Sequence, residues 1–311
     1  MNDPYVDAGW PRQNVSTVPQ PAWPLTDAEP AWLLINGDLE PRLPEDIRSL
    51  SGPCGYHWVW RGTAAEYAPP GYQTGPLLTR LNEPLLERFI HDWGPRQAGL
   101  MLFGPAQISP LLQQLRSITH LSSADDNSLA FHWSRPRTLE ELCEALPSHY
   151  LSRLFSPIRS MLWHSGLEPD SWLRADIPAN PSSSTLESPP LTLTVNDEAA
   201  LNRASHAWFM RRTCHLMSQA LSTLGEQLAP LNLRRQLAKF DKESDLCGFH
   251  LERDRRYYME LRLLFPEHPF VNDQPLFDLL VQSEIQGLQR LHEINDRLNQ
   301  ISAPIRPRNT P

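Results

Sequence analysis

The pattern of apolar residues changes at residues 174–190, and this change constrains the fold more than any other feature. The stretch is Arg-Ala-Asp-Ile-Pro-Ala-Asn-Pro-Ser-Ser-Ser-Thr-Leu-Glu-Ser-Pro-Pro, which has few side chains to bury and several helix breakers. Before it, short apolar runs alternate with amphipathic stretches, as in α/β proteins. After it, apolar residues recur at helical spacing only. The sequence therefore predicts an α/β lobe, a mixed sheet with flanking helices, followed by an all-α lobe.

Five regions follow from this division. We expect a proline-rich arm at 1–29, the α/β lobe at 30–173, a linker at 174–192, the helical lobe at 193–302 and a tail at 303–311. The arm places Trp10 and Trp23 between prolines and has no periodicity. It should be ordered only where its tryptophans find a groove.

Individual elements can be placed by their apolar runs and end signals. The expected strands are Trp32–Ile35, Tyr56–Trp60, Gly99–Phe103 and Leu129–Trp133. Helices should start at Asn82, at Ser109, at Thr138 with a Thr-x-x-Glu capping box, and at Asn196. One further helix should end at Pro266, and a long last helix should carry the leucines from Leu280 to Leu298.

The charge and apolar content exclude several classes. A net charge of −8 argues against binding to nucleic acid or to an anionic membrane, because both require positive charge. No apolar run approaches the roughly 20 residues that span a bilayer. The first residues lack the basic and apolar regions of a signal peptide, so a cytoplasmic protein is expected. The 4 cysteines are scattered and are expected to be free thiols.

A search for reactive groups predicts no catalytic residue, no metal ligand and no cofactor. The sequence has no nucleophile elbow, no His-Glu-x-x-His helix, no Walker loop and no dinucleotide fingerprint. Cys214, His215 and His206 would point in different directions on one helix. Carboxylates from Asp241 to Glu252 could serve a nuclease, but they stand in mixed-sign runs that are typical of solvated helix faces. A nuclease would show a metal-dependent activity that is lost on mutating Asp241 or Glu252.

Arginine and tryptophan suggest a different kind of site. Lys239 and Lys242 are the only lysines, so the basic side chains are almost all arginine. Arginine and aromatic side chains are the usual anchors of protein interfaces. Core packing is the expectation for Trp133, whereas Trp172 lies next to linker sequence. The predicted partner-binding residues are Arg116, Trp133, Arg135, Arg137, Trp172, Trp208 and Arg212.

Five motifs occur in a characteristic order between residues 30 and 165: Leu33-Leu34-Ile35-Asn36-Gly37, Gly75-Pro76-Leu77-Leu78, Gly99-Leu100-Met101-Leu102-Phe103, Leu111-x-x-x-Leu115-Arg116 and Pro136-Arg137. This order resembles the adaptor chaperones of bacterial type VI secretion. Two positions depart from that family: Arg135 stands where an aspartate is usual, and His132 where an arginine is common. The Pro-Arg turn then either ends a strand before a helix or contacts a partner.

The resemblance implies a cytosolic chaperone or adaptor that catalyses nothing. It would bind a cognate secreted effector toxin and promote its loading onto the VgrG/PAAR spike complex, with a spike protein as its second partner. Neither nucleic acid nor membrane insertion would be involved, and the helical lobe would be the source of cargo specificity. Two alternatives remain: an immunity protein that neutralises the toxin, which a toxicity rescue assay would separate from a loader, and a hydrolase or nuclease with a dispersed active site.

Overall fold

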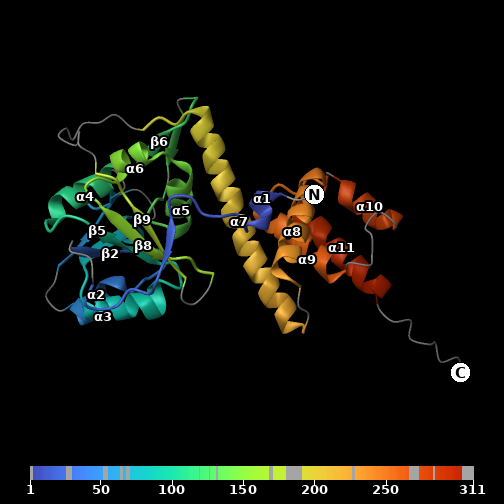
Figure 1. The fold of residues 1–311 in the computed structure, drawn as a ribbon, viewed down its shortest axis with the longest axis horizontal. Coiled ribbons are helices and arrows are strands. Elements are labelled where there is room, and N and C mark those ends of the chain that lie inside the picture. The colour runs from blue at the N-terminus through green and yellow to red at the C-terminus, as the bar shows by residue number, and fades with distance from the viewer. Residues whose placement is uncertain are drawn as a thin grey trace, which may run out of the picture. The chain divides into compact units, whose positions relative to one another are not determined.

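The computed structural model describes residues 3–25, 30–51, 55–63, 66–67, 71–118, 120–125, 127–130, 132–167, 171–179, 191–225, 228–265, 273–282 and 284–302. The chain divides into two compact units (Figure 1). The first, Arg12–Trp208, is called the sheet domain below. The second, called the helical domain, combines Met1–Pro11 with Phe209–Pro311.

A seven-stranded sheet organises the sheet domain. Its order is β1-β9-β8-β5-β2-β4-β3, and every pairing in it is antiparallel. The strands are β1 (Ser16–Val18), β2 (Ala31–Asn36), β3 (Tyr56–Trp58), β4 (Pro76–Arg80), β5 (Gly99–Phe103), β8 (Ser160–His164) and β9 (Trp172–Asp176). A separate hairpin joins β6 (His120–Ser122) to β7 (Ser128–Ala130).

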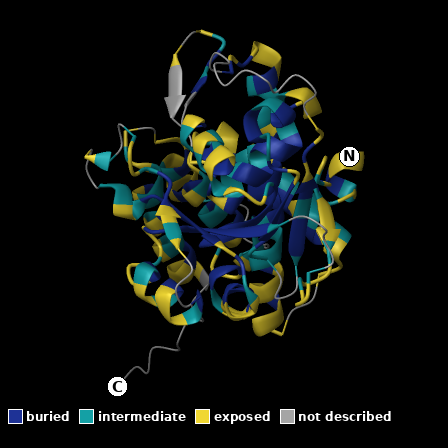
Figure 2. Cartoon of the chain, turned by 90° about the vertical axis from the view of Figure 1, so that its left-hand side faces the viewer, coloured by how far each residue is buried: buried dark blue, intermediate teal, exposed yellow. Residues whose placement is uncertain are grey.

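Helices cover both faces of this sheet (Figure 2). They are α2 (Leu43–Ser51), the 3-10 turn η2 (Tyr72–Thr74), α3 (Glu83–Arg88) with the π-turn η3 (Phe89–Trp93), α4 (Ile108–Ser117), α5 (Pro136–Ala145) and α6 (Ser148–Phe155). Every residue of β2 and β5 is buried. A strand that is covered on both faces cannot alternate apolar with polar residues, which explains the continuous apolar runs in the sequence.

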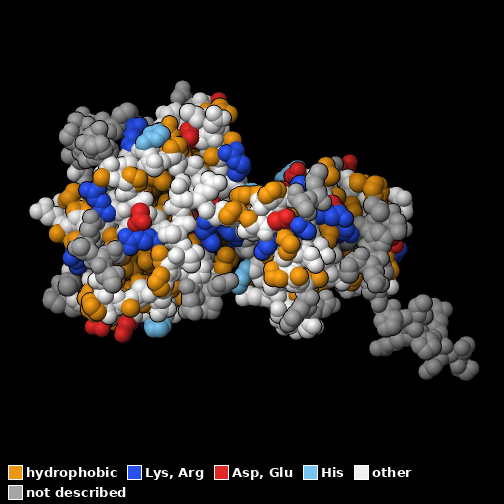
Figure 3. Space-filling view, in the orientation of Figure 1, with side chains coloured by type: hydrophobic (Ala, Val, Ile, Leu, Met, Phe, Trp, Pro, Cys, Tyr) orange, Lys and Arg blue, Asp and Glu red, His pale blue; other side chains and the backbone are white. Residues whose placement is uncertain are grey.

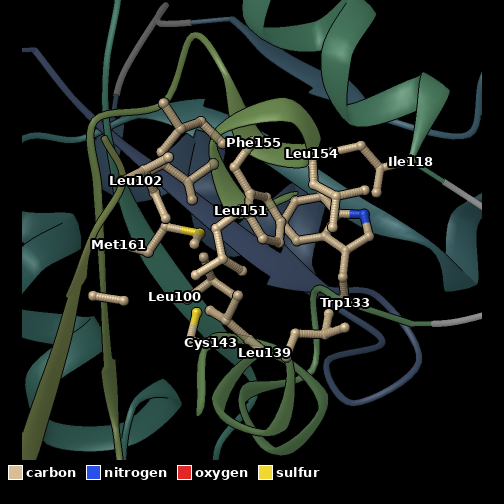
Figure 4. Packing of buried hydrophobic residues seen from close by; sticks show 14 of the residues in the cluster. Leu100, Leu102, Ile118, Trp133, Leu139, Cys143, Leu151, Leu154, Phe155 and Met161 are labelled. Carbon is tan, nitrogen blue, oxygen red and sulfur yellow. The ribbon is translucent and has the colours of Figure 1, made fainter. Parts of the chain in front are cut away.

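Alternate side chains of β2 pack into two different hydrophobic cores, one on each face of the sheet. Leu33 and Ile35 pack in the cluster that contains α2 and α3, whereas Trp32 and Leu34 pack in the cluster that contains α4, α5 and α6. Figure 4 shows part of the second cluster, in which the side chains of α5 and α6 meet those of β5 and β8. The period of two along a strand separates the two cores.

The helical domain contains α1 (Pro4–Asp7), α8 (Pro230–Leu246), α9 (Glu252–Leu264), α10 (Gln274–Val281), α11 (Gly287–Ser302) and the second half of α7 (Val195–Thr223). A sheet with flanking helices followed by a helical region confirms the predicted fold class, although the sheet is antiparallel throughout and not mixed. The single last helix predicted through Leu280–Leu298 is wrong, because α10 and α11 are separate. At the first residue of α11, Gly287 packs so tightly that a Cβ would lie 2.6 Å from Asp254 Oδ2.

The helix starts agree with the sequence in part. The Leu85 N–H donates to Asn82 Oδ1 over 3.0 Å, which confirms the predicted cap. The capping box at Thr138 is wrong, because α5 already begins at Pro136, whose fixed φ suits the first helical position. α7 starts one residue before Asn196, and a reciprocal pair forms instead: the Thr194 N–H donates to Asp197 Oδ2 over 2.8 Å, and the Asp197 N–H donates to Thr194 Oγ1 over 3.2 Å.

Two predicted irregular regions contain strands. The expected arm includes β1, and the expected linker begins inside β9, which pairs with β1 on one side and β8 on the other. β1 is a short edge strand, in which main-chain pairing needs no apolar periodicity. β9 is an interior strand of five residues, and its last three positions read as part of the polar segment that follows. Residues 180–190 of the linker lie outside the described residues, as do the tail from 303 and residues 26–29 of the arm.

The division between the domains also differs from the predicted boundary at residue 193. Leu191 and Leu193 are buried in the core of the sheet domain, and the Ser122 N–H donates to the Leu191 carbonyl over 2.9 Å. The first half of α7 therefore belongs to the sheet domain, and the division falls within this helix, after Trp208.

Cys143 on α5 is expected to resist alkylation in the folded protein. Its side chain is fully buried, and burial raises the pKa of the thiol above its ordinary value of 9.0. The folded state disfavours the thiolate, so the stabilising contribution of the neutral thiol falls as pH rises past about 9. Mass spectrometry after iodoacetamide treatment should find Cys143 unmodified in native protein and modified in urea. Cys143 labelling as fast as that of the partly exposed Cys214 would contradict its burial.

Candidate partner-binding site

Three segments that are far apart in the sequence meet where β2 ends. The Gly37 N–H donates to the Gly75 carbonyl over 3.0 Å, and the Asp38 N–H donates to the Thr74 carbonyl over 3.1 Å. A Cβ on Gly37 would overlap the carbonyl oxygen of Gln73, so only glycine fits there. The motif Leu33–Gly37 therefore contacts the motif Gly75–Leu78 directly, through their backbones.

The third segment joins them through a buried pair of polar side chains. Asn36 Nδ2 donates to the Ser134 carbonyl over 3.2 Å, and Ser134 Oγ donates to Asn36 Oδ1 over 2.8 Å. Both residues are buried, where unpaired polar groups would be costly. This pair fixes the turn that leads into α5 against the end of β2. We call residues 36–38, 74–76 and 134–137 together the motif junction.

Arg135, the main departure from the family pattern, lies at the exposed rim of the motif junction. Its guanidinium contacts Asp38 Oδ2 at 2.7 Å, and its side chain is 53% exposed. Such an exposed pair contributes little to stability, because water and salt screen it. Arg135 therefore lies at an exposed position, in an ion pair that can exchange.

Arg137 connects the motif junction to α7. Its Nε donates to Glu141 Oε1 over 2.8 Å, and its guanidinium carbon lies 4.2 Å from the ring centroid of Trp208. Another of its nitrogens donates to Ser205 Oγ over 3.2 Å. A cation over an indole face gains about 0.5–2 kcal/mol, depending on desolvation. Arg137 therefore connects the turn before α5 to the first half of α7, and its side chain is 36% exposed.

Arg116 reaches the motif junction from α4. Its Nε donates to the Val59 carbonyl over 3.0 Å, and the Val59 N–H donates to the Pro76 carbonyl over 2.9 Å. The next residue, Trp60, packs on Gly75 and lies with its ring centroid 6.1 Å from that of His132. The second departure from the family pattern, His132, therefore contacts an aromatic ring at the same place.

Of the seven candidate residues, Arg137 and Trp208 are in contact, Arg135 precedes Arg137 in the same turn, and Arg116 is linked to the motif junction only through Val59. Trp133 lies behind them in the core, with its ring centroid 5.9 Å from that of Phe155. Placing Trp172 next to a linker was wrong, because it is fully buried in β9 between Phe89 and His164. Arg212 belongs to the helical domain.

Three residues of the motif junction were missed by the sequence analysis. Asn36, Asp38 and Ser134 carry its polar contacts. The available signal was Asn36 itself, a polar residue at the end of an apolar strand, which needs a partner when buried. Its partner is 98 residues away in sequence and could not be identified without the fold.

The carboxylates that suggested a nuclease are engaged with arginines in the helical domain. Asp241 lies 2.7 Å from Arg255, and Glu243 lies 3.2 Å from Arg262. Within the described part of the chain, no group of three or more His, Cys, Asp or Glu side chains could hold a metal ion. The α8–α9 carboxylates thus act as a structural ion-pair network.

Replacing Ser134 by alanine should lower the free energy of unfolding of the sheet domain by about 1–3 kcal/mol, because Asn36 Oδ1 would lose its donor in a buried place. Thermal unfolding measures the change. The matched control is Ser117→Ala, which removes an exposed hydroxyl that bonds only to its own helix. Equal stabilities for the two variants would show that the buried pair does not hold the motif junction.

Comparison with known proteins agrees with the position of the motif junction. Residues 31–153 match the family model described as a domain of unknown function, DUF4123. This match contains all three segments of the motif junction. The search of curated proteins and the search of solved structures both found no match. Among the described helices, none combines the length and the apolar character that crossing a membrane requires.

Proposed function

We propose that this protein is a cytoplasmic adaptor chaperone, which binds a cognate effector of type VI secretion and promotes its loading onto the spike complex. The resemblance of residues 30–165 to such chaperones supports the secretion pathway. Three of the five motifs that carry this resemblance, Leu33–Gly37, Gly75–Leu78 and Pro136–Arg137, meet in the motif junction. The family model itself names no function for residues 31–153.

The observation that carries a protein-binding role is the apolar surface of the helical domain. Leu246 is 87% exposed and Leu251 60% exposed, and the two flank the turn between α8 and α9. On α10, Phe277 and Val281 are four residues apart and both exposed, so they share one helix face. Figure 3 shows hydrophobic side chains interspersed with charged ones over the region of α8–α11. Exposed apolar patches of this kind mark protein interaction sites.

Charge supports a protein partner over other kinds. The chain carries a net charge of −8, which opposes binding to nucleic acid or to anionic lipid. The described arginines form many pairs with carboxylates and aromatic rings, so they do not create a strongly positive surface. An apolar surface bordered by mixed charges is suited to another polypeptide.

The test is coexpression with the effector encoded beside this gene. A tagged effector should retain the full chain through purification, and the complex should then associate with the spike protein. Changing Leu246 and Leu251 together to glutamine should weaken effector binding by at least about tenfold, since buried apolar anchors carry most of the energy of an interface. Isothermal titration with purified proteins measures this affinity.

The matched control is Val195→Gln, which changes an exposed apolar residue of the sheet domain. It should leave effector affinity within about twofold of wild type, as expected for a surface change away from the contact. Failure of every adjacent effector to bind would overturn the proposal. Rescue of cells from the toxin without association with the spike would replace it with an immunity function.

A further inference from the structure

The first residues of the chain form a docked peptide in the helical domain. Asp3 caps α1, accepting from the Tyr5 N–H over 3.0 Å, and the Trp10 N–H donates to the Tyr5 carbonyl over 3.0 Å. The segment from Asp3 to Pro11 therefore has a compact shape of its own. It packs on α8, more than 200 residues away in sequence.

Three arginines hold this peptide, and two of them bind its main chain. Arg211 donates to the Trp10 carbonyl over 2.8 Å, and Arg234 donates to the Asp7 carbonyl over 2.8 Å. Arg235 donates two hydrogen bonds of 2.8 Å each to the Asp7 carboxylate. Bidentate arginine–carboxylate pairs are among the strongest and most specific polar contacts. We call Arg211, Arg234 and Arg235 the arginine seat.

The peptide side chains add specificity to the arginine seat. Trp10 is only 2% exposed, although sequence around it is rich in proline. Gly9 has a φ of +76° and lies over Arg234, so that a Cβ there would be 3.5 Å from Arg234 Cδ. A side chain at this position would be strained by the positive φ, although a Cβ would be only in ordinary van der Waals contact with the arginine. The site therefore selects an acidic residue, followed by any residue, then glycine and then tryptophan.

We propose that the arginine seat is a peptide-binding site, which recognises Asp-x-Gly-Trp segments of partner proteins and which the chain's own first residues occupy in their absence. Two carbonyl contacts recognise any main chain of the right shape, while the carboxylate and the indole select the sequence. The identity of the partner as an effector rests on the proposed function, whereas the existence of the site does not.

The contacts of the seat are suited to exchange. Within α1 and the residues that follow it to Pro11, Val6 and Trp10 are the buried apolar side chains. The Asp7–Arg235 pair is partly exposed, with side-chain exposures of 27% and 38%. Its hydrogen bonds, together with the positive charge of Arg234, hold the pKa of Asp7 below its ordinary value, so the carboxylate is charged near neutral pH. A competitor must still exceed the local concentration of a tethered peptide, which reaches the millimolar range.

The experiment uses full-length protein and a fluorescent peptide with the sequence of residues 3–11. Wild-type protein should bind it weakly, since its own segment competes. The full-length Trp10→Ala variant should bind it at least about tenfold more tightly, because its own segment has lost its anchor. Adding Arg235→Ala to this variant should abolish the gain, and a peptide carrying Asp7→Asn and Trp10→Ala is the control ligand. Fluorescence anisotropy gives each affinity.

A second measurement covers the case in which Trp10→Ala fails to fold. Saturating peptide added to wild-type protein should raise the hydrogen exchange of residues 3–11, because their own place is taken. No increase at saturation, or equal affinity of the wild type and the Trp10→Ala variant for the peptide, would overturn the proposal. Loss of effector copurification with intact peptide binding would instead count against the proposed function alone.

Discussion

Replacing Trp172 by alanine is expected to lower the free energy of unfolding of the sheet domain by about 3–5 kcal/mol, the usual cost of removing a buried tryptophan. The side chain is 0% exposed, and its ring lies 5.5 Å from Phe89 and 5.0 Å from His164 by centroid distance. Gly94 is also packed against it, since a Cβ there would be 2.7 Å from the indole. No neighbour can move to fill the space without disturbing β8, β9 and η3.

Urea titration followed by circular dichroism measures the loss, and hydrogen exchange in β8 assigns it to the sheet domain. The matched control is Trp23→Ala, which removes a tryptophan that is 44% exposed and should cost less than about 1 kcal/mol. A Trp172→Ala protein with wild-type stability and weakened partner binding would instead place this side chain in a contact surface.

Replacing Gly37 by alanine is expected to destabilise the sheet domain by about 3 kcal/mol, at the upper end of the usual cost of overpacking. The new methyl group would overlap the Gln73 carbonyl oxygen and lie 2.9 Å from the Trp58 ring. Because one obstacle is backbone, η2 would have to move away from the end of β2. The motif junction should then open, and the hydrogen bond from the Gly37 N–H to the Gly75 carbonyl should be lost.

The control for this change is Gly55→Ala, where the nearest atom to a new Cβ is His57 Nε2 at 4.0 Å. This variant should unfold within about 0.5 kcal/mol of wild type, as surface changes usually do. Amide exchange of Asp38 and Gly75 adds a local readout, which should rise only in Gly37→Ala. Equal melting temperatures for the two variants would contradict the close approach of the two motifs.

The departures from the family pattern are informative because of where they lie. Arg135 pairs with Asp38 at the exposed rim, and His132 packs beside Trp60. The Asn36–Ser134 pair forms the buried part of the motif junction. Both departures therefore lie outside the buried hydrogen bonds of the junction.

Local sequence patterns were enough to predict several elements of this protein and their order. The apolar runs at Trp32–Ile35 and Gly99–Phe103 became β2 and β5, and Asn82 capped its helix, because strand burial and capping depend on neighbouring residues. The change in periodicity also predicted a sheet domain followed by helices. The starts of α5 and α7 were missed by one or two residues, since several caps compete within one turn.

Tertiary structure alone decided the pairings between distant segments. Nothing in the sequence near Trp172 shows that β1 and β8 flank it, so a core residue was taken for a linker residue. In the same way, Asn36 meets Ser134 across 98 positions, and Asp7 meets Arg235 across 228. Periodicity reports which face of an element is buried, but it carries no information about which partner buries it. Both candidate sites of this protein are made by such long-range partners, and so they emerged only with the fold.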